Sequence, residues 1–123
     1  MSDADSDDVN KKDSYGNTKL INAARAGQLD TCKSLLEQGA NVDLTTENGC
    51  SPLLCAAQRG HSDIVNLLLD WGSNIDLLDN DGDSPLIVAA RYGKSETVTI
   101  LLDRGANIGI QSKDGFTAIS VQP

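Results

Sequence analysis

The sequence predicts an all-α solenoid, in which a pair of short helices is repeated along the chain and a turn projects at each junction. Three observations predict this fold class. Glycines recur every 33 residues in three series, one of which comprises Gly16, Gly49, Gly82 and Gly115. Leucine, isoleucine and alanine recur at the same interval between the glycines. Aromatic residues make up only 3% of the 123 residues, so the core must be aliphatic. A fixed period of this size indicates a stacked repeat protein.

The first helix of the repeated unit is clearest where it begins at Ser51 and Pro52. A serine side chain accepts hydrogen bonds from the free N–H groups of a helix start, and proline fits the first turn. Two small residues, Ala56 and Ala57, allow a neighbouring helix to approach closely. Gly60 then ends the helix.

The second helix is expected to begin near Ser62 and to end at Gly72. Between these residues an apolar stripe at helical spacing predicts one buried face, formed by Ile64, Val65, Leu68 and Leu69. Beyond this helix, the Asp-Gly pair at residues 81–82 favours a tight turn with positive φ. Each unit is therefore predicted to be two helices followed by an extended turn.

These residues resemble the ankyrin repeat, most clearly from Asn48 to His61 and from Asp70 to Asp76. The resemblance implies a short curved ankyrin-repeat solenoid, with β-hairpin or turn fingers directed toward its concave side. One repeat cannot bury its own apolar face, so three repeats are near the lower limit for stability. The predicted domains are a disordered acidic tail at 1–12, ankyrin repeats at 13–45, 46–78 and 79–111, and a partial fourth repeat at 112–123.

The chain departs from the family pattern at one position of every repeat. The family usually places a histidine after its Thr-Pro-Leu triplet, where it links the turns of adjacent repeats. In this chain the four units have other residues there, namely Ile21, Leu54, Ile87 and Ser120. We therefore expect the repeats to adhere mainly through apolar contacts. Polar Asn22 and Ser34, at positions that are apolar in the third unit, predict that the first repeat is an N-terminal cap.

The fourth unit stops at Pro123, before a second helix. This favours a fragment of a longer array. The alternative is a third repeat whose apolar face is covered only by the partial unit. We expect a monomer, with self-stacking through the uncapped C-terminal repeat as the alternative.

Composition argues against several function classes. The 18 acidic residues outnumber the 10 basic residues, and the resulting net charge of −8 argues against nucleic acid and membrane partners. No apolar run reaches the ~18 residues of a membrane-spanning helix, and the acidic N-terminus is unlike a secretory signal. The three cysteines fit neither a disulfide framework nor a zinc site. We therefore expect a reducing compartment, the cytoplasm, with the nucleus as the alternative.

No set of residues predicts a metal ion or a cofactor. Asp79, Asp81 and Asp83 alternate as in a calcium loop. However, Gly82 comes too early for such a loop, and Ala90 stands in the place of its bidentate glutamate. We expect these three residues to form an acidic fingertip.

No set of residues predicts catalysis either. His61 lacks a catalytic partner at a motif spacing and is expected to be structural. Cys32 and Cys55 align with valines and are expected in the core. Cys50 is expected to be a surface thiol beside a finger, with nothing nearby to make it a thiolate. The sequence therefore predicts that the protein is not an enzyme.

The resemblance also indicates where a partner would bind, because ankyrin proteins usually hold partners with their fingertips and the exposed ends of their first helices. Tryptophan, tyrosine and arginine are often interface anchors, and both Tyr lie at such positions. The only Trp, Trp71, lies at a further exposed position, just before Gly72. The predicted protein-binding residues are Tyr15, Asn17, Arg25, Glu47, Asn48, Arg59, Trp71, Asn80, Asp81, Asp83, Arg91 and Tyr92.

The predicted function is a protein–protein interaction module. Its expected partner carries mixed charge, with a basic segment facing Glu47, Asp81 and Asp83. The alternative is a regulatory or targeting segment of a larger enzyme, channel or scaffold protein.

Overall fold

The computed structural model describes residues 8–118 and is all-α over this range, with no strand. The predicted fold class is therefore confirmed, although the fingers are turns rather than β-hairpins. The helices are α2 (Lys19–Ala26), α3 (Leu29–Glu37), α4 (Pro52–Arg59), α5 (Ser62–Asp70), α6 (Pro85–Arg91) and α7 (Ser95–Asp103).

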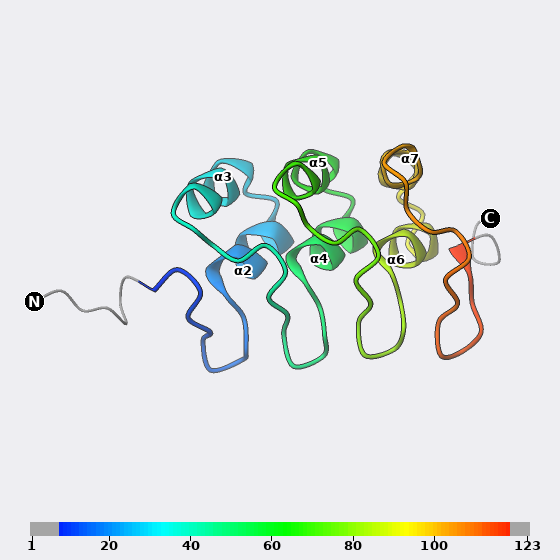
Figure 1. Cartoon of the computed structure of the whole chain (residues 1–123), viewed down its shortest axis with the longest axis horizontal. Helices are drawn as coiled ribbons and strands as arrows, with labels where there is room; N and C mark the ends of the chain where they lie inside the picture. Colours follow the sequence, from blue (N-terminus) through cyan, green and yellow to red (C-terminus); the bar gives the residue numbers. More distant parts are fainter. Residues whose placement is uncertain (1–7, 119–123) are drawn as a thin grey trace, which may run out of the picture.

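The helices form two layers, with the turns projecting from one side (Figure 1). The first helices, α2, α4 and α6, pack against one another in order along the chain. The second helices, α3, α5 and α7, form the layer farther from the turns (Figure 1). Each first helix also packs against the second helix of its own repeat.

The starts of the first helices are set by the same side-chain cap in each repeat. The Ser51 hydroxyl accepts a hydrogen bond from Leu54 N, and Pro52 occupies the first turn, as the sequence predicts. Thr18 and Ser84 form the equivalent caps of α2 and α6. Each cap satisfies an N–H group that has no partner within the helix.

The core between the layers is aliphatic, as expected. The largest fully buried side chains include Leu20, Leu36, Leu53, Ile64 and Leu86. The residues that replace the family histidine, Ile21, Leu54 and Ile87, are also buried. Cys32 and Cys55 lie in the core, as expected from their alignment with valines.

A polar ladder also joins the repeats, and the expectation of mainly apolar adhesion missed it. The backbone N–H groups of three asparagines 33 residues apart each donate to a side chain 31 residues earlier, in the preceding repeat or, for Asn41, in the segment before repeat 1. The donor and acceptor pairs are Asn41 and Asn10, Asn74 and Asp43, and Asn107 and Asp76. Asp43 accepts a further hydrogen bond from the Ser73 hydroxyl.

Four fingers project from the layers, and we define them as residues 13–17, 46–50, 79–83 and 112–116, fingers 1 to 4. In each finger the N–H of the first residue donates to the carbonyl of the last. The side-chain oxygen of the first residue, in turn, accepts from the N–H of the last. The predicted positive φ at Gly82 is confirmed, at 78°.

Backbone hydrogen bonds also connect neighbouring fingers. Asn80 N donates to Asn48 O, joining fingers 2 and 3, and Lys113 N donates to Asp81 O, joining fingers 3 and 4. Within the described part of the chain, no backbone hydrogen bond joins finger 1 to finger 2.

The N-terminal boundary needs a correction. Residues 8–12 were expected to belong to a disordered tail, but Val9 packs against the core and Asn10 accepts the hydrogen bond from Asn41 N. These contacts extend the ladder to the N-terminal side of repeat 1. The expected disorder of residues 1–7 lies outside the described residues, as do residues 119–123 of the partial fourth repeat.

Candidate protein-binding surface

A pocket of about 370 Å³ opens between fingers 1 and 2 and the ends of α2 and α4. It brings together six of the twelve predicted binding residues from two repeats. These residues are Tyr15, Asn17, Arg25, Glu47, Asn48 and Arg59. Thr46, Cys50, Cys55 and Gln58 complete the lining.

The two arginines of the pocket are held differently. Arg25 donates to the side chains of Asn17 and Asn22, both at 3.3 Å, and its Nη2 lies 4.0 Å from Cys55 Sγ. Arg59 is exposed, and within residues 8–118 its guanidinium has no hydrogen bond or ion pair. Arg25 therefore forms part of the pocket wall, whereas Arg59 has its donors available to a ligand.

The exposed side chains at the rim of the pocket include an aromatic ring and both signs of charge. Tyr15 is 79% exposed. Its ring is therefore available to a partner and is not needed for packing in the core. Glu47 is also exposed, and its carboxylate has no partner within the described part of the chain. The pocket thus presents an aromatic ring, a free carboxylate and a free guanidinium to a partner.

Asp83 does not belong to an exposed fingertip, which corrects the sequence prediction. It is only 4% exposed, and both of its oxygens accept hydrogen bonds from Arg91, at 2.8 and 3.3 Å. The Arg91 guanidinium also lies 5.6 Å from the centre of the Phe116 ring, in finger 4. Asp83 and Arg91 therefore stabilise the junction of fingers 3 and 4 rather than facing a partner.

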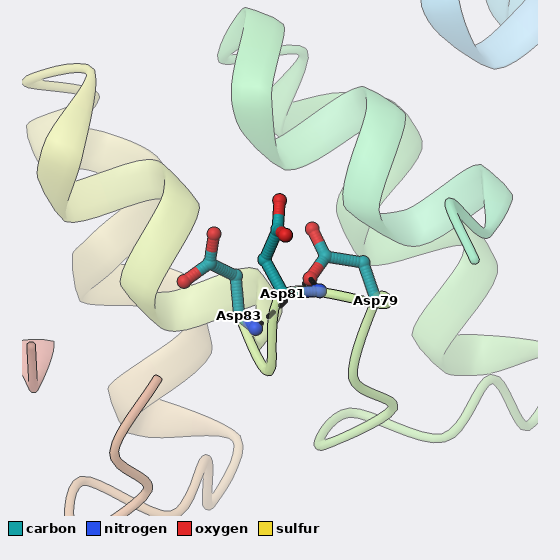
Figure 2. A group of neighbouring side chains, drawn as sticks. All are labelled: Asp79, Asp81 and Asp83. Atoms are coloured by element: carbon teal, nitrogen blue, oxygen red, sulfur yellow. Dashed lines mark hydrogen bonds between the residues drawn. The ribbon is translucent and has the colours of Figure 1, made fainter. Parts of the chain in front are cut away.

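Among residues 8–118, the acidic group of finger 3 is the cluster whose spacing could suit a metal ion, since oxygens of Asp79, Asp81 and Asp83 lie within 4.8 Å of one another (Figure 2). Two of these carboxylates are already engaged. Asp79 Oδ1 accepts from the N–H groups of Asp81 and Asp83, and Asp83 pairs with Arg91. Burial, opposed by these two hydrogen bonds, raises the pKa of Asp79 above its usual value. Asp81 alone remains exposed and unpaired among the three.

Asn80 has a structural role in addition to its exposure. Its Nδ2 donates to Glu47 O at 2.9 Å, next to the backbone bond from Asn80 N to Asn48 O. Asn48 and Asn80 therefore position fingers 2 and 3 relative to each other.

Comparison with known proteins identifies the repeated unit. A family model described as ankyrin repeats (3 copies) matches residues 3–79 and 20–112. The chain belongs to the ankyrin-repeat family. Ankyrin repeats generally serve as protein–protein interaction modules, and the family is typically non-enzymatic.

The ankyrin repeats of this chain are also similar to part of a human protein. The chain is 44% identical over 48 residues to BCL-6 corepressor-like protein 1 from Homo sapiens. The aligned segment covers 39% of this chain and 3% of that protein. Within residues 8–118, no ankyrin helix has the length and apolar character needed to span a membrane.

Trp71 lies at the end of a second helix, as its place before Gly72 predicts, and therefore outside the surface that the ankyrin fingers and first helices form. It is 49% exposed and caps the C-terminus of α5, in the layer of second helices (Figure 1). Tyr92, by contrast, caps the end of α6, a first helix, and is 52% exposed. The structure therefore groups Tyr92 with the first helices but does not bring Trp71 together with Tyr15.

His61 has the structural role expected from the ankyrin resemblance. Its Nε2 lies 3.2 Å from Arg25 O, at the end of the first helix of the preceding repeat. The imidazole thus satisfies a C-terminal carbonyl group of α2 across the repeat junction.

A thiol pair in the pocket wall was missed by the sequence analysis. Cys50 Sγ and Cys55 Sγ lie 3.0 Å apart, and both side chains line the pocket. The expectation that nothing near Cys50 makes that residue a thiolate agrees with the structure, because its hydrogen bond to Cys55 and its burial raise the pKa of Cys50. The pKa of Cys55 is lowered, chiefly because the Cys50 thiol donates a hydrogen bond to it, with help from the positive charge of Arg25. The signal in the sequence was the spacing of the two cysteines about the Ser51 cap.

Proposed function

We propose that this chain binds a partner protein, without catalysis, through the pocket between fingers 1 and 2 and the adjoining finger surface. The observation that carries the proposal is the convergence of Tyr15, Glu47 and Arg59 from two repeats on one pocket. A tyrosine and an arginine at one site are typical of interface anchors. The general role of ankyrin repeats supports the same function.

The charges of this surface favour a partner of mixed charge. Glu47 and Asp81 are exposed carboxylates that suit a basic segment, whereas Arg59 suits an acidic or carbonyl group. We exclude Asp83 from the acidic surface, because its carboxylate already forms an ion pair with Arg91. The basic segment of the partner is therefore assigned to Glu47 and Asp81 only.

The alternative function is a regulatory or targeting segment within a larger protein. The similarity to 3% of the human relative supports this alternative, because it places repeats of this kind inside a far longer chain. Both functions use the same binding surface. We also propose a reducing compartment, the cytoplasm or the nucleus, because the number and spacing of the three cysteines do not fit a disulfide framework.

The test is a pull-down from cell lysate, read by quantitative mass spectrometry. The pocket variant carries Tyr15→Ala, Glu47→Gln and Arg59→Gln. The matched control carries Trp71→Ala, Glu37→Gln and Lys33→Gln, which remove the same kinds of group from exposed positions of the second-helix layer. We expect the wild type and the control to capture a common partner that the pocket variant loses, at unchanged helicity.

A partner that the pocket variant retains and the control loses would contradict the proposal and place the interface on α3 and α5. For a captured partner, Glu47→Gln with Asp81→Asn should weaken binding and reduce its dependence on salt, since two rim charges are removed. Unchanged affinity and salt dependence would contradict the assignment of a basic segment.

A further inference from the structure

Cys50 and Cys55 occupy the two positions that meet at the start of a capped helix. With Ser51 as the N-cap of α4, Cys50 is the residue before the cap and Cys55 is the fourth residue of the helix. Side chains at these two positions commonly pack against each other, which explains contact between residues five apart in sequence. The equivalent pairs in repeats 1 and 3 are Asn17 with Asn22 and Asp83 with Val88, so the second repeat alone places two thiols there.

The pair is open to small molecules. Cys50 is partly exposed, Cys55 is buried beneath it, and both line the pocket between fingers 1 and 2. Cys32 provides a contrast within the same chain, because it is fully buried in the core and lines no such pocket.

Positive charge at the pair favours the thiolate form. Arg25 Nη2 lies 4.0 Å from Cys55 Sγ, and Arg59 lines the same pocket. The lowered pKa of Cys55 and the raised pKa of Cys50 have the same main cause, the hydrogen bond between the two sulfurs. Burial, by contrast, raises the pKa of Cys32 to about 11. Reactivity toward oxidants follows thiolate character and access, so it should be confined to the pair.

We propose that Cys50 and Cys55 are a redox modification site, at which hydrogen peroxide converts the two thiols into a reversible intramolecular disulfide. The Cys55 thiolate attacks one peroxide oxygen and the O–O bond breaks. Cys55 becomes a sulfenic acid, and the departing hydroxide takes a proton to become water. Cys50 then attacks the sulfur of Cys55, the S–O bond breaks, and the hydroxide leaves as water with the proton of Cys50. Two thiols have lost two electrons and two protons, and one peroxide has become two waters.

This site is inferred without reference to the proposed partner binding, although the two thiols line the same pocket. The site fits a compartment in which disulfides are transient and redox-sensing. A dithiol reductant would restore both thiols by disulfide exchange.

The test exposes the purified chain to hydrogen peroxide, blocks the remaining thiols with N-ethylmaleimide, and measures intact and peptide masses. We expect the wild type and Cys32→Ala to lose two alkylatable thiols together and to regain them with dithiothreitol. Trypsin should release both cysteines in one peptide, Ser34–Arg59, with the mass of the disulfide form. In Cys50→Ser, which lacks the resolving thiol, dimedone should trap a sulfenic acid on Cys55.

Three outcomes would overturn the proposal. They are oxidation of Cys32 as rapid as that of the pair, disulfides that form only between chains, and accumulation of sulfinic acid on wild-type Cys55 with no internal disulfide. A dimedone adduct on Cys50 of the Cys55→Ser variant, formed as fast as that on Cys55, would overturn the assignment of Cys55 as the attacking sulfur.

Discussion

Gly27 lies at a close approach between two ankyrin repeats. Its φ of 77° is in the left-handed region, and a Cβ atom built there would lie 2.8 Å from the imidazole of His61. His61 is fixed in this position by its contact with Arg25 O. Gly60 occupies the same place one repeat later with nearly the same φ, but it faces the flexible chain of Lys94. Substitution of either glycine adds the same backbone strain, so a comparison of the two isolates the cost of the contact with His61.

We expect Gly27→Ala to lower the free energy of unfolding by about 2 kcal/mol or more, because strain and the clash with His61 both act. Gly60→Ala, the matched control, should cost about 1 kcal/mol, because Lys94 can rotate away. Urea denaturation of both variants measures the difference. Equal losses would show that the imidazole moves without cost.

At the scale of a single element, each finger is stabilised by the oxygen of its first side chain. Asp79 fulfils this role in finger 3, where it accepts two backbone N–H groups beside two other carboxylates. Its raised pKa means that the folded protein binds the Asp79 proton more tightly than the unfolded chain does. The charge of Asp79 therefore destabilises the fold at neutral pH, and this penalty disappears as the pH falls through the pKa of the folded state.

Asp79→Asn should therefore raise the urea midpoint at pH 7, because the amide retains the accepting oxygen and removes the charge. The difference from wild type should shrink as the pH falls, because the wild-type carboxyl then becomes neutral as well. Urea titrations at several pH values between neutral and acidic measure this trend. A variant less stable than wild type at pH 7 would show that the charge strengthens the two hydrogen bonds by more than burial costs.

Across the whole molecule, stability depends on the junctions between repeats, because each repeat contacts only its neighbours. The polar ladder crosses each junction, but its members differ in strength. The Asp43 carboxylate holds both Ser73 and Asn74, whereas Asp76 holds Asn107 alone. The junction between repeats 1 and 2 therefore has the stronger ladder contact.

Asp43→Ala should lower the free energy of unfolding by about 1–2 kcal/mol, because two donors lose a charged acceptor. Asp76→Ala should cost about 1 kcal/mol or less, since one donor is affected. Hydrogen exchange followed along the chain adds a local measure, and Asp43→Ala should accelerate exchange in α3 more than in α7. Uniform acceleration would indicate that the repeats unfold only together.

The fold could be predicted from the sequence because its signals are local or periodic. The Ser51 cap, the end of α4 at Gly60 and the aliphatic stripe of α5 each depend on residues within one or two helical turns. The pairing of Asp83 with Arg91 could not be predicted in this way, because it requires the side-chain directions of a folded finger. The ladder requires the stacking offset between repeats, although the recurrence of Asn41, Asn74 and Asn107 was visible. The exposure of Trp71 was predicted, but its separation from Tyr15 was not, because that requires the arrangement of the two helix layers.

The missing backbone bond between fingers 1 and 2 distinguishes the pocket from the other finger junctions. A ligand that separates fingers 2 and 3 must break the bond from Asn80 N to Asn48 O, and one that separates fingers 3 and 4 must break the bond from Lys113 N to Asp81 O. Among residues 8–118, separation of finger 1 from finger 2 breaks no such backbone bond. A ligand can therefore enter the pocket beside Tyr15 without breaking a backbone hydrogen bond between fingers 1 and 2.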